Sequence, residues 1–310
     1  MPEGFTHTGP AWDLLVSALL RLGGVLALGL VGILLADRGK DRPLSESVLF
    51  VRWRTWVAIL PVWLVVVVHP LAAVVVIVAL SLQAVREFAA LTRLHRASRA
   101  LLYAVALVST PMAAVDFTSW RALPPLLLLV ATIVPLLRQD TEDGVRDLSL
   151  TTVGMVYLPY LLTFVWLLRA HGRAGPGVVL ALGLAVALSD VGAFVAGRAL
   201  GRTPLAGRLS PNKTREGLLG NLIGAALGVW WTSFATGDVP VGLLVCIPFV
   251  VALGAVWGDL LESLLKRQHG AKDAGGWLPG FGGLLDRIDS LLVVAPLTYT
   301  LVVVSGSVLP

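Results

Sequence analysis

The sequence predicts an all-α polytopic membrane protein, a helical bundle with about nine to ten transmembrane helices. Of its 310 residues, 56% are hydrophobic and only 14% are charged, and the mean hydropathy is +0.84. Soluble domains contain about 45–50% apolar and about 25% charged residues. A soluble domain of roughly this length also leaves about a quarter of its surface exposed. The composition therefore excludes an ordinary soluble enzyme, a disordered chain and a secreted disulfide scaffold.

The apolar residues gather in runs close to the ~20 residues that a helix needs to cross a bilayer. We identify ten candidate spans, at 14–36, 56–68, 70–85, 100–117, 121–137, 150–169, 177–197, 217–236, 239–262 and 289–308. His69 and Pro70 separate the second span from the third, because proline breaks or kinks a helix. The 56–68 run is short for a full span, so nine spans is the alternative.

Lysine and arginine alternate between the two ends of these spans. Of the 24 basic residues, 20 fall in five loops, at 37–55, 86–99, 138–149, 198–216 and 263–288. The connections on the opposite side hold only Arg121, Arg169 and Arg173. Because basic loops stay on the cytoplasmic side of a membrane, we expect these five in the cytoplasm and both termini outside. The expected location is the cell (inner) membrane.

The net charge of +5 and the pI of about 9.8 raise the question of a polyanionic partner. Since the basic residues lie in short loops between apolar runs, we expect an anionic lipid surface and no nucleic acid. Residues 1–13 contain no lysine or arginine, so we expect no secretory signal peptide. The one cysteine, Cys246, cannot form a disulfide within the chain.

The two parts of the chain differ in polarity. Residues 1–176 carry few polar residues within their spans, which is typical of a transmembrane scaffold. From residue 177 onward, acids appear within or at the ends of spans, and the loops 198–216 and 263–288 are densely polar. We therefore expect residues 177–310 to form the catalytic transmembrane region.

The first polar constellation lies between residues 188 and 221. Asp190 falls within an apolar run, where an acid costs about 2.5–3.5 kcal/mol on insertion scales and so usually marks a functional interior. The segment 210–217 (SPNKTREG) could hold a phosphate group through backbone N–H groups, the helix dipole and two cations. The alternative is a helix cap that carries membrane-anchoring charges. Small residues that allow close helix packing precede it, at Gly192, Gly197 and Gly201.

The second constellation covers residues 257–292. Asp259, Glu262 and Ser263 share one helical face, as do Asp286 and Asp289. Glu262 also lies four residues before Lys266, so the simplest interpretation of those two is a helix-surface ion pair. Between the acids, GGWLPGFGG (275–283) predicts a loop whose backbone can approach a ligand closely.

This number of carboxylates favours a hard divalent cation. Mg²⁺ takes oxygen ligands and typically uses one or two carboxylates together with substrate phosphates. Zinc is disfavoured, because one cysteine and five scattered histidines give no ligand spacing. The sequence contains neither a G-x-S-x-G motif nor a P-loop.

Residues 257–292 resemble the signature of the phosphatidate cytidylyltransferases, the CDP-diacylglycerol synthase family. The residues that match are Ser263, Lys266-Arg267, Lys272-Asp273, Pro279-Gly280-Phe281-Gly282-Gly283 and Asp286-Arg287-Ile288-Asp289. A second conserved stretch of the family resembles the block Ser189-Asp190, Gly197-Arg198, Ser210-Pro211-Asn212-Lys213-Thr214 and Glu216-Gly217. The first 170 residues match only as apolar spans.

Two positions depart from the family pattern. Phe281 stands where the family has a histidine, and Arg215 stands where the family has an aromatic residue. A phenylalanine can neither titrate nor ligate a metal nor donate a hydrogen bond. Arg215 adds a cation that could bind phosphate in a different way.

The resemblance implies transfer of CMP from CTP to phosphatidic acid, giving CDP-diacylglycerol and pyrophosphate for phospholipid biosynthesis. It implies Mg²⁺ on Asp259 and Asp286, with a second cation shared with Asp190 or Asp289. The residues that it assigns to catalysis are Lys266, Arg267, Lys272, Asp273 and Arg287. Those that it assigns to substrate binding are Ser210, Asn212, Lys213, Thr214, Arg215, Ser263, Gly282 and Gly283.

The charges of the reactants suit such a site. A phosphate monoester is largely dianionic at pH 7, since its second pKa is about 6, so it needs no strong general base. The barrier is the meeting of two anions, which charge neutralisation and in-line positioning lower. We expect the lipid to enter from the inner leaflet into a polar cleft that is open to bilayer and cytoplasm.

Three other interpretations stay open on the sequence. A transporter also has many spans and intramembrane acids, although no inverted repeat is visible here. A CTP-dependent enzyme for another lipid phosphate is consistent with Phe281 and Arg215, and the third alternative is a non-catalytic membrane homologue. A homodimer stays open as well.

Overall fold

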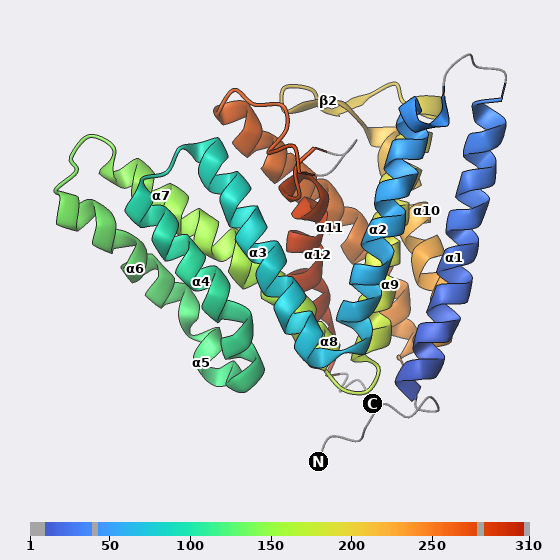
Figure 1. Cartoon of the computed structure of the whole chain (residues 1–310), viewed down its shortest axis with the longest axis horizontal. Coiled ribbons are helices and arrows are strands. Elements are labelled where there is room, and N and C mark those ends of the chain that lie inside the picture. Colours follow the sequence, from blue (N-terminus) through green and yellow to red (C-terminus); the bar gives the residue numbers. More distant parts are fainter. Residues whose placement is uncertain (1–9, 39–42, 238, 278–281, 307–310) are drawn as a thin grey trace.

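The chain folds into a bundle of helices with one small β-hairpin (Figure 1). The structure is a computed structural model that describes residues 10–38, 43–237, 239–277 and 282–306. Its α-helices are α1 (Pro10–Ala36), α2 (Val48–Val68), α3 (Pro70–Thr92), α4 (Arg96–Val115), α5 (Phe117–Arg121), α6 (Leu123–Arg138), α7 (Gly144–Met155), α8 (Leu161–Ala170), α9 (Gly175–Leu200), α10 (Arg215–Trp231), α11 (Val241–Gln268) and α12 (Leu285–Val304). The strands are β1 (Pro204–Ala206) and β2 (Ser210–Thr214), and a π-helical turn, η2 (Val156–Tyr160), joins α7 to α8. The described residues also contain two 3₁₀ turns, η1 (Leu44–Glu46) and η3 (Ser233–Ala235).

Eight helical stretches among the described residues are long and apolar enough to cross a membrane. The predicted all-α polytopic fold is therefore confirmed. Each of the ten predicted spans contains a helix, but α6 has only 16 residues and α10 only 17. At 1.5 Å per residue these two helices are roughly 24–26 Å long, which is less than the ~30 Å of a hydrocarbon core.

Several helices extend further into the predicted loops than the hydropathy suggests. α2 begins at Val48, inside the predicted loop 37–55, and its 21 residues are enough for a full span. The predicted break at Pro70 is confirmed, since Pro70 is the first residue of α3 and the Ala72 N–H donates to His69 Nδ1 at 3.2 Å. α11 continues to Gln268 and α12 begins at Leu285, so the true connection is shorter than the predicted loop 263–288.

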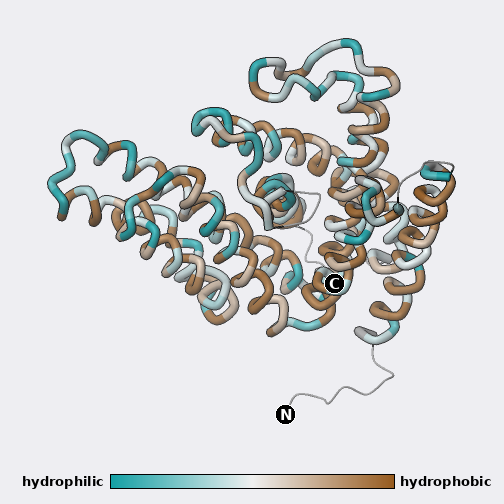
Figure 2. Tube along the Cα trace, turned by 45° about the horizontal axis from the view of Figure 1, so that its top comes forward, coloured by the Kyte–Doolittle hydropathy of each residue, from teal (hydrophilic) through white to brown (hydrophobic). Residues whose placement is uncertain are grey.

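The five basic connections lie together at one end of the bundle, uppermost in Figure 1. We call this the loop end. It comprises the connections α1–α2, α3–α4, α6–α7, α9–α10 and α11–α12. Figure 2 shows apolar helices, with the hydrophilic residues concentrated in these connections. The alternation of basic and non-basic loops along the sequence therefore corresponds to the two ends of the fold.

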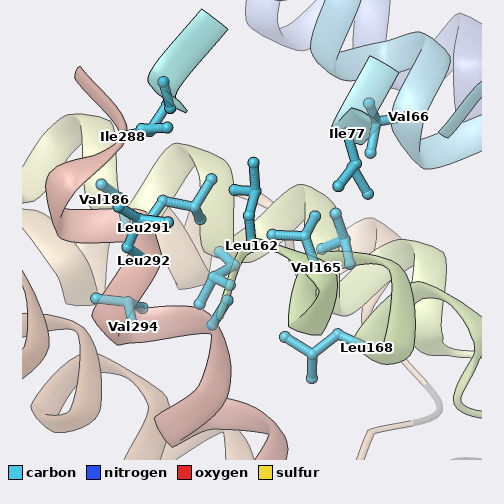
Figure 3. Packing of buried hydrophobic residues seen from close by; sticks show 14 of the residues in the cluster. Val66, Ile77, Leu162, Val165, Leu168, Val186, Ile288, Leu291, Leu292 and Val294 are labelled. Atoms are coloured by element: carbon cyan, nitrogen blue, oxygen red, sulfur yellow. The ribbon is translucent and has the colours of Figure 1, made fainter. Parts of the chain in front are cut away.

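The apolar core is continuous between the first and second parts of the chain. Leu162, Val165 and Leu168 of α8 are almost completely buried. They lie between residues of α2 and α3 on one side and residues of α12 on the other (Figure 3). The core thereby holds α12 against helices that precede it by more than a hundred residues.

Glycines bring α9 and α10 unusually close. A Cβ atom on Gly192 would lie 2.1 Å from the Gly220 carbonyl oxygen, and one on Gly220 would lie 2.2 Å from the Gly192 carbonyl oxygen. A Cβ atom on Gly224 would lie 2.1 Å from the Leu188 carbonyl oxygen. The packing role expected of Gly192 is therefore confirmed, and the β-hairpin joins two helices that lie in close contact.

Candidate active site

A cavity of about 270 Å³ lies where α9, α10, α11, α12 and the β-hairpin meet. Its polar lining consists of Asp190, Asn212, Lys213, Thr214, Asn221, Asp259, Asp286 and Arg287. Its apolar lining includes Ala193, Phe194, Leu205, Leu218 and Val256. Both polar constellations of the sequence thus contribute to one cavity.

Three of the four predicted metal ligands line this cavity, each from a different helix. Asp190 comes from α9, Asp259 from α11 and Asp286 from α12. The fourth, Asp289, is only 4% exposed and lies behind the cavity, one turn along α12 from Asp286. Its carboxyl group interacts with those of Asp259 and Glu262. The acids therefore form one cluster at one end of the bundle.

Two lysines compensate the charge of these acids. Lys213 of β2 forms an ion pair with Asp259. Lys266 Nζ lies 2.6 Å from Glu262 Oε2 and 2.6 Å from Asp286 Oδ1. The predicted pair of Glu262 and Lys266 is confirmed, but the lysine also links α11 to α12. With a side chain only 13% exposed, Lys266 is part of the interior of the site.

The loop between α11 and α12 is held by Asp286. Its Oδ2 atom accepts hydrogen bonds from the N–H groups of Ala274 at 3.0 Å and Gly283 at 2.8 Å. A Cβ atom on Gly283 would lie 3.0 Å from this same oxygen, and Gly282 has a φ of +83°. Both glycines are thus needed for the loop to close around the carboxylate. Phe281 lies outside the described residues.

The segment predicted to bind phosphate at a helix start is largely a strand. β2 pairs with β1 in antiparallel register, with Ala206 opposite Ser210 and Pro204 opposite Thr214. The helix cap of the alternative interpretation is confirmed, since Thr214 Oγ1 accepts the Gly217 N–H at 3.1 Å. Asn212, Lys213 and Thr214 line the cavity, whereas neither Ser210 nor Arg215 is among its lining residues.

The carboxylate of Glu216 fixes the base of the hairpin. Its Oε2 atom accepts the N–H groups of Arg202 at 3.1 Å and Thr203 at 3.2 Å. Hydrogen bonds from the backbone N–H groups of Glu216 itself, Arg202 and Thr203 lower the pKa of this carboxyl to about 2. The hairpin is therefore anchored to the first turn of α10.

Seven other predicted site residues are not among those that line the cavity, namely Ser263, Lys266, Arg267, Lys272, Asp273, Gly282 and Gly283. Arg267 is exposed, and its Nε atom lies 3.5 Å from the Leu209 carbonyl oxygen of the hairpin. Lys272 and Asp273 are exposed in the α11–α12 connection, and Ser263 is half-buried on α11. Among the predicted catalytic residues, only Arg287 lines the cavity itself, and Lys266 lies directly behind Asp286.

The structure adds polar groups that the sequence motifs do not include. Asn221 lines the cavity, and its buried Oδ1 atom has no hydrogen-bond partner within the described residues. The hydroxyl of Tyr157, in the π-helical turn, is also buried without such a partner. It is close enough to Asp289 to interact with it electrostatically. Asn221 could have been noticed in the sequence, because it is an isolated amide side chain within the apolar run 217–236. No local pattern identifies Tyr157.

The oxygen donors of the site are of the kind that hard cations prefer. Within the described part of the chain, no three His, Cys, Asp or Glu side chains converge closely enough to hold a metal ion by themselves. Mg²⁺ does not require such a cage, because it takes one or two carboxylates together with waters and phosphates. Glu262 Oε1 is buried without a hydrogen-bond partner among these residues, and Asp190 and Asp259 open into the cavity. The donor set therefore fits a magnesium ion.

Comparison of the sequence with models of protein families gives a match. The model of the cytidylyltransferase family matches residues 50–305. The chain belongs to the cytidylyltransferase family. The match includes both polar constellations, all thirteen lining residues named above, and ten of the α-helices in full, from α3 to α12.

Curated cytidylyltransferases of several bacteria are similar to this chain. It is 40% identical over 162 residues to a phosphatidate cytidylyltransferase of Mycobacterium leprae, and 43% identical over 141 residues to one of Helicobacter pylori. A third, from Synechocystis, is 32% identical over 229 residues. The matched segments cover 52%, 44% and 57% of this chain and 51%, 52% and 75% of those proteins. The chain thus spans about half the length of the first two relatives.

Proposed function

We propose that this cytidylyltransferase family member transfers CMP from CTP to phosphatidic acid, forming CDP-diacylglycerol and pyrophosphate for phospholipid biosynthesis. The observation that carries the proposal is the cavity itself, in which Asp190, Asp259 and Asp286 meet the cations Lys213 and Arg287. Such a mixed lining suits a reaction between anions that a metal ion brings together. The similar proteins are named phosphatidate cytidylyltransferases, which supports the same activity.

The apolar wall of the cavity supports a lipid as one of the two substrates. Phe194 and Leu218 line the cavity, and the Phe194 side chain is 59% exposed. Val191 and Val195, beside it on α9, are also exposed. A lipid could therefore place its phosphate among the polar residues while its acyl chains lie against α9 in the bilayer.

The proposed reaction is a phosphoryl transfer at the α-phosphorus of CTP. A phosphate oxygen of phosphatidic acid attacks that phosphorus, the bond to the oxygen that bridges the α- and β-phosphates breaks, and pyrophosphate leaves. Lys213 and Arg287 line the cavity and would offset the negative charge of the reacting phosphates. Lys266 keeps Asp286 in place through the contact between α11 and α12.

We propose that Asp259 and Asp286 hold Mg²⁺, with Asp190 or Asp289 contributing to a second cation. When bound, the ion would neutralise phosphate charge and align the two substrates. Without the metal ion, Lys213 compensates the charge of Asp259 and Lys266 compensates that of Asp286. Six other predicted residues lie outside the cavity lining and would contact CTP only where it extends beyond the cavity. They are Ser210, Arg215, Ser263, Arg267, Lys272 and Asp273.

The loop end is the side that we propose to face the cytoplasm. It contains the basic connections and the cavity lining from β2 and the start of α12. CTP is a cytoplasmic nucleotide, and basic loops stay on that side of the inner membrane. The substrates would thus reach the cavity from the cytoplasm and from the inner leaflet.

The test is product formation by the purified full chain in mixed micelles. Labelled CTP and Mg²⁺ are supplied with phosphatidic acid, with a polyprenyl phosphate, with an ether analogue of phosphatidic acid, or with no lipid. We expect labelled CDP-diacylglycerol with phosphatidic acid only. Product from another lipid phosphate alone, or no turnover of CTP in any arm, would contradict the proposed substrate or the proposed activity, respectively.

A further inference from the structure

Glu87 is a buried acid that the first part of the chain contributes to the loop end. It lies on α3, far from the signature residues in sequence, and is 6% exposed. Its Oε1 atom accepts the Leu284 N–H at 3.0 Å, and its Oε2 atom accepts the Leu285 N–H at 2.8 Å. Gln83, one turn earlier on α3, donates to Oε1 at 2.9 Å. Both carboxylate oxygens are therefore directed at the start of α12.

This contact supplies what α12 lacks locally. The first N–H groups of a helix have no partners within the helix, and the N-cap of α12, Leu284, has no side chain that could accept them. A carboxylate at this position forms charge-assisted hydrogen bonds and interacts favourably with the helix dipole. Glu87 thus caps α12 from a different helix.

The same turn of backbone carries Asp286. Gly283 donates to Asp286, while Leu284 and Leu285 donate to Glu87, so two carboxylates share three successive N–H groups. A Cβ atom on Gly283 would lie 2.6 Å from Glu87 Oε2 and 3.0 Å from Asp286 Oδ2. The position of Glu87 is therefore coupled sterically and by hydrogen bonds to that of Asp286.

We propose that Glu87 is a positioning residue of the active site, which caps α12 from α3 and thereby sets the position of Asp286 relative to Lys266 and the cavity. The proposal rests on the proposed function, in which Asp286 acts on the reacting phosphates. It gives the first part of the chain a role in the chemistry beyond that of a scaffold.

Hydrogen exchange of the full chain in detergent, without substrates or metal, tests the cap directly. In Glu87→Gln one oxygen becomes an NH₂ group that cannot accept a backbone N–H. We expect the amides of residues 283–286 to exchange at least about tenfold faster than in the wild type. The control is Asp147→Asn, which removes another buried acid, bonded to Ser98 on α4, and should leave these amides unchanged.

Kinetics then test whether the cap matters for the reaction. We expect Glu87→Gln to lower kcat by about tenfold to about 100-fold, because small displacements of reacting groups have effects of this size. The KM for phosphatidic acid should stay within about twofold, since Glu87 does not line the cavity. A merely structural role would reduce the amount of folded enzyme without changing kcat per folded molecule.

A neighbouring pair of glycines gives a test that removes no carboxylate. A Cβ atom on Gly275 would lie 3.0 Å from both Cδ and Oε1 of Glu87, whereas one on Gly276 would have no atom within 4 Å. We expect Gly275→Ala to displace Glu87 and to reproduce both effects more mildly. Gly276→Ala should behave as the wild type.

The proposal is overturned if Glu87→Gln leaves the exchange of residues 283–286 unchanged, or if it leaves kcat within about twofold of the wild type. It is equally overturned if Asp147→Asn or Gly276→Ala has the same effects. Failure of the proposed function is distinguishable, because the wild type would then form no CDP-diacylglycerol while the exchange experiment would still report on the cap.

Discussion

Lys266 and Lys213 both pair with acids of the site, but their surroundings differ. Lys266 is 13% exposed and lies between Glu262 and Asp286, whereas the side chains of Lys213 and Asp259 are 24% and 33% exposed. Removing one partner of a buried ion pair costs about 3–5 kcal/mol, because the other charge is left uncompensated. Partly exposed pairs contribute about 1 kcal/mol or less.

We therefore predict that the two lysine substitutions separate stability from activity. Lys266→Met should lower the thermal unfolding temperature in detergent strongly and abolish activity. Lys213→Met should change that temperature little, yet lower the rate by about 10²–10³, the usual cost of losing one charge-stabilising group. Equal losses of stability in the two variants would contradict the assigned environments.

Helical spacing and the cost of an acid within an apolar run identified most of the acids of the site in the sequence. Asp190 is unusual within its apolar run, and Asp259, Glu262, Asp286 and Asp289 follow helical spacing. Glu87 could not be found in this way, because its partners Leu284 and Leu285 are 197 and 198 residues away and contribute backbone N–H groups, which every sequence has.

At the scale of elements, the close contact of α9 with α10 depends on glycine. We predict that Gly220→Ala destabilises the protein by about 1–3 kcal/mol, because its Cβ atom would meet the Gly192 carbonyl oxygen. Gly24→Ala in α1 is the matched control, since a Cβ atom there has no neighbour within 4 Å. Thermal unfolding of the two variants in one detergent measures the difference, and equal unfolding temperatures would contradict the prediction.

The hairpin should depend on pH through Glu216. The pKa of its carboxyl is lowered from 4.5 to about 2 in the folded protein. The ionised group therefore stabilises the hairpin fully above the unfolded pKa, and this contribution is lost as the pH falls through about 2. We predict that amide exchange in residues 202–214, corrected for its intrinsic pH dependence, becomes less protected over this range.

Glu216→Gln provides the control for the hairpin. It should weaken the protection of residues 202–214 from exchange at neutral pH. It should also remove the loss of protection between pH 4.5 and 2 that protonation of Glu216 causes in the wild type. A wild-type hairpin that keeps full protection down to pH 2 would contradict the anchoring role of this carboxylate.

Hydropathy predicted where the helices lie better than where they end. Runs of apolar residues identify the parts of helices within a bilayer, but α2 begins eight residues before its predicted span. The hairpin was not predicted either, because β1 and β2 have only three and five residues, too few to give a clear strand pattern in the sequence.

At the scale of the whole molecule, the gathering of basic connections at one end predicts a single orientation in the membrane. In a Cys246→Ala background, Arg208→Cys in the hairpin should react with an impermeant maleimide only after the cytoplasmic side is exposed. Arg173→Cys, in the α8–α9 connection, should react in intact cells. Labelling of both positions from the same side would contradict this orientation.

The most direct measurement compares Asp286→Asn with Asp147→Asn in the assay with CTP, Mg²⁺ and phosphatidic acid. Both variants lose one buried acid, but only Asp286 lines the cavity. We predict that Asp286→Asn inserts normally into the membrane and loses about 10²-fold or more of the rate, while Asp147→Asn keeps its rate per folded molecule. Turnover of Asp286→Asn at the wild-type rate would contradict the proposal that the acids of this cavity take part in the nucleotide transfer.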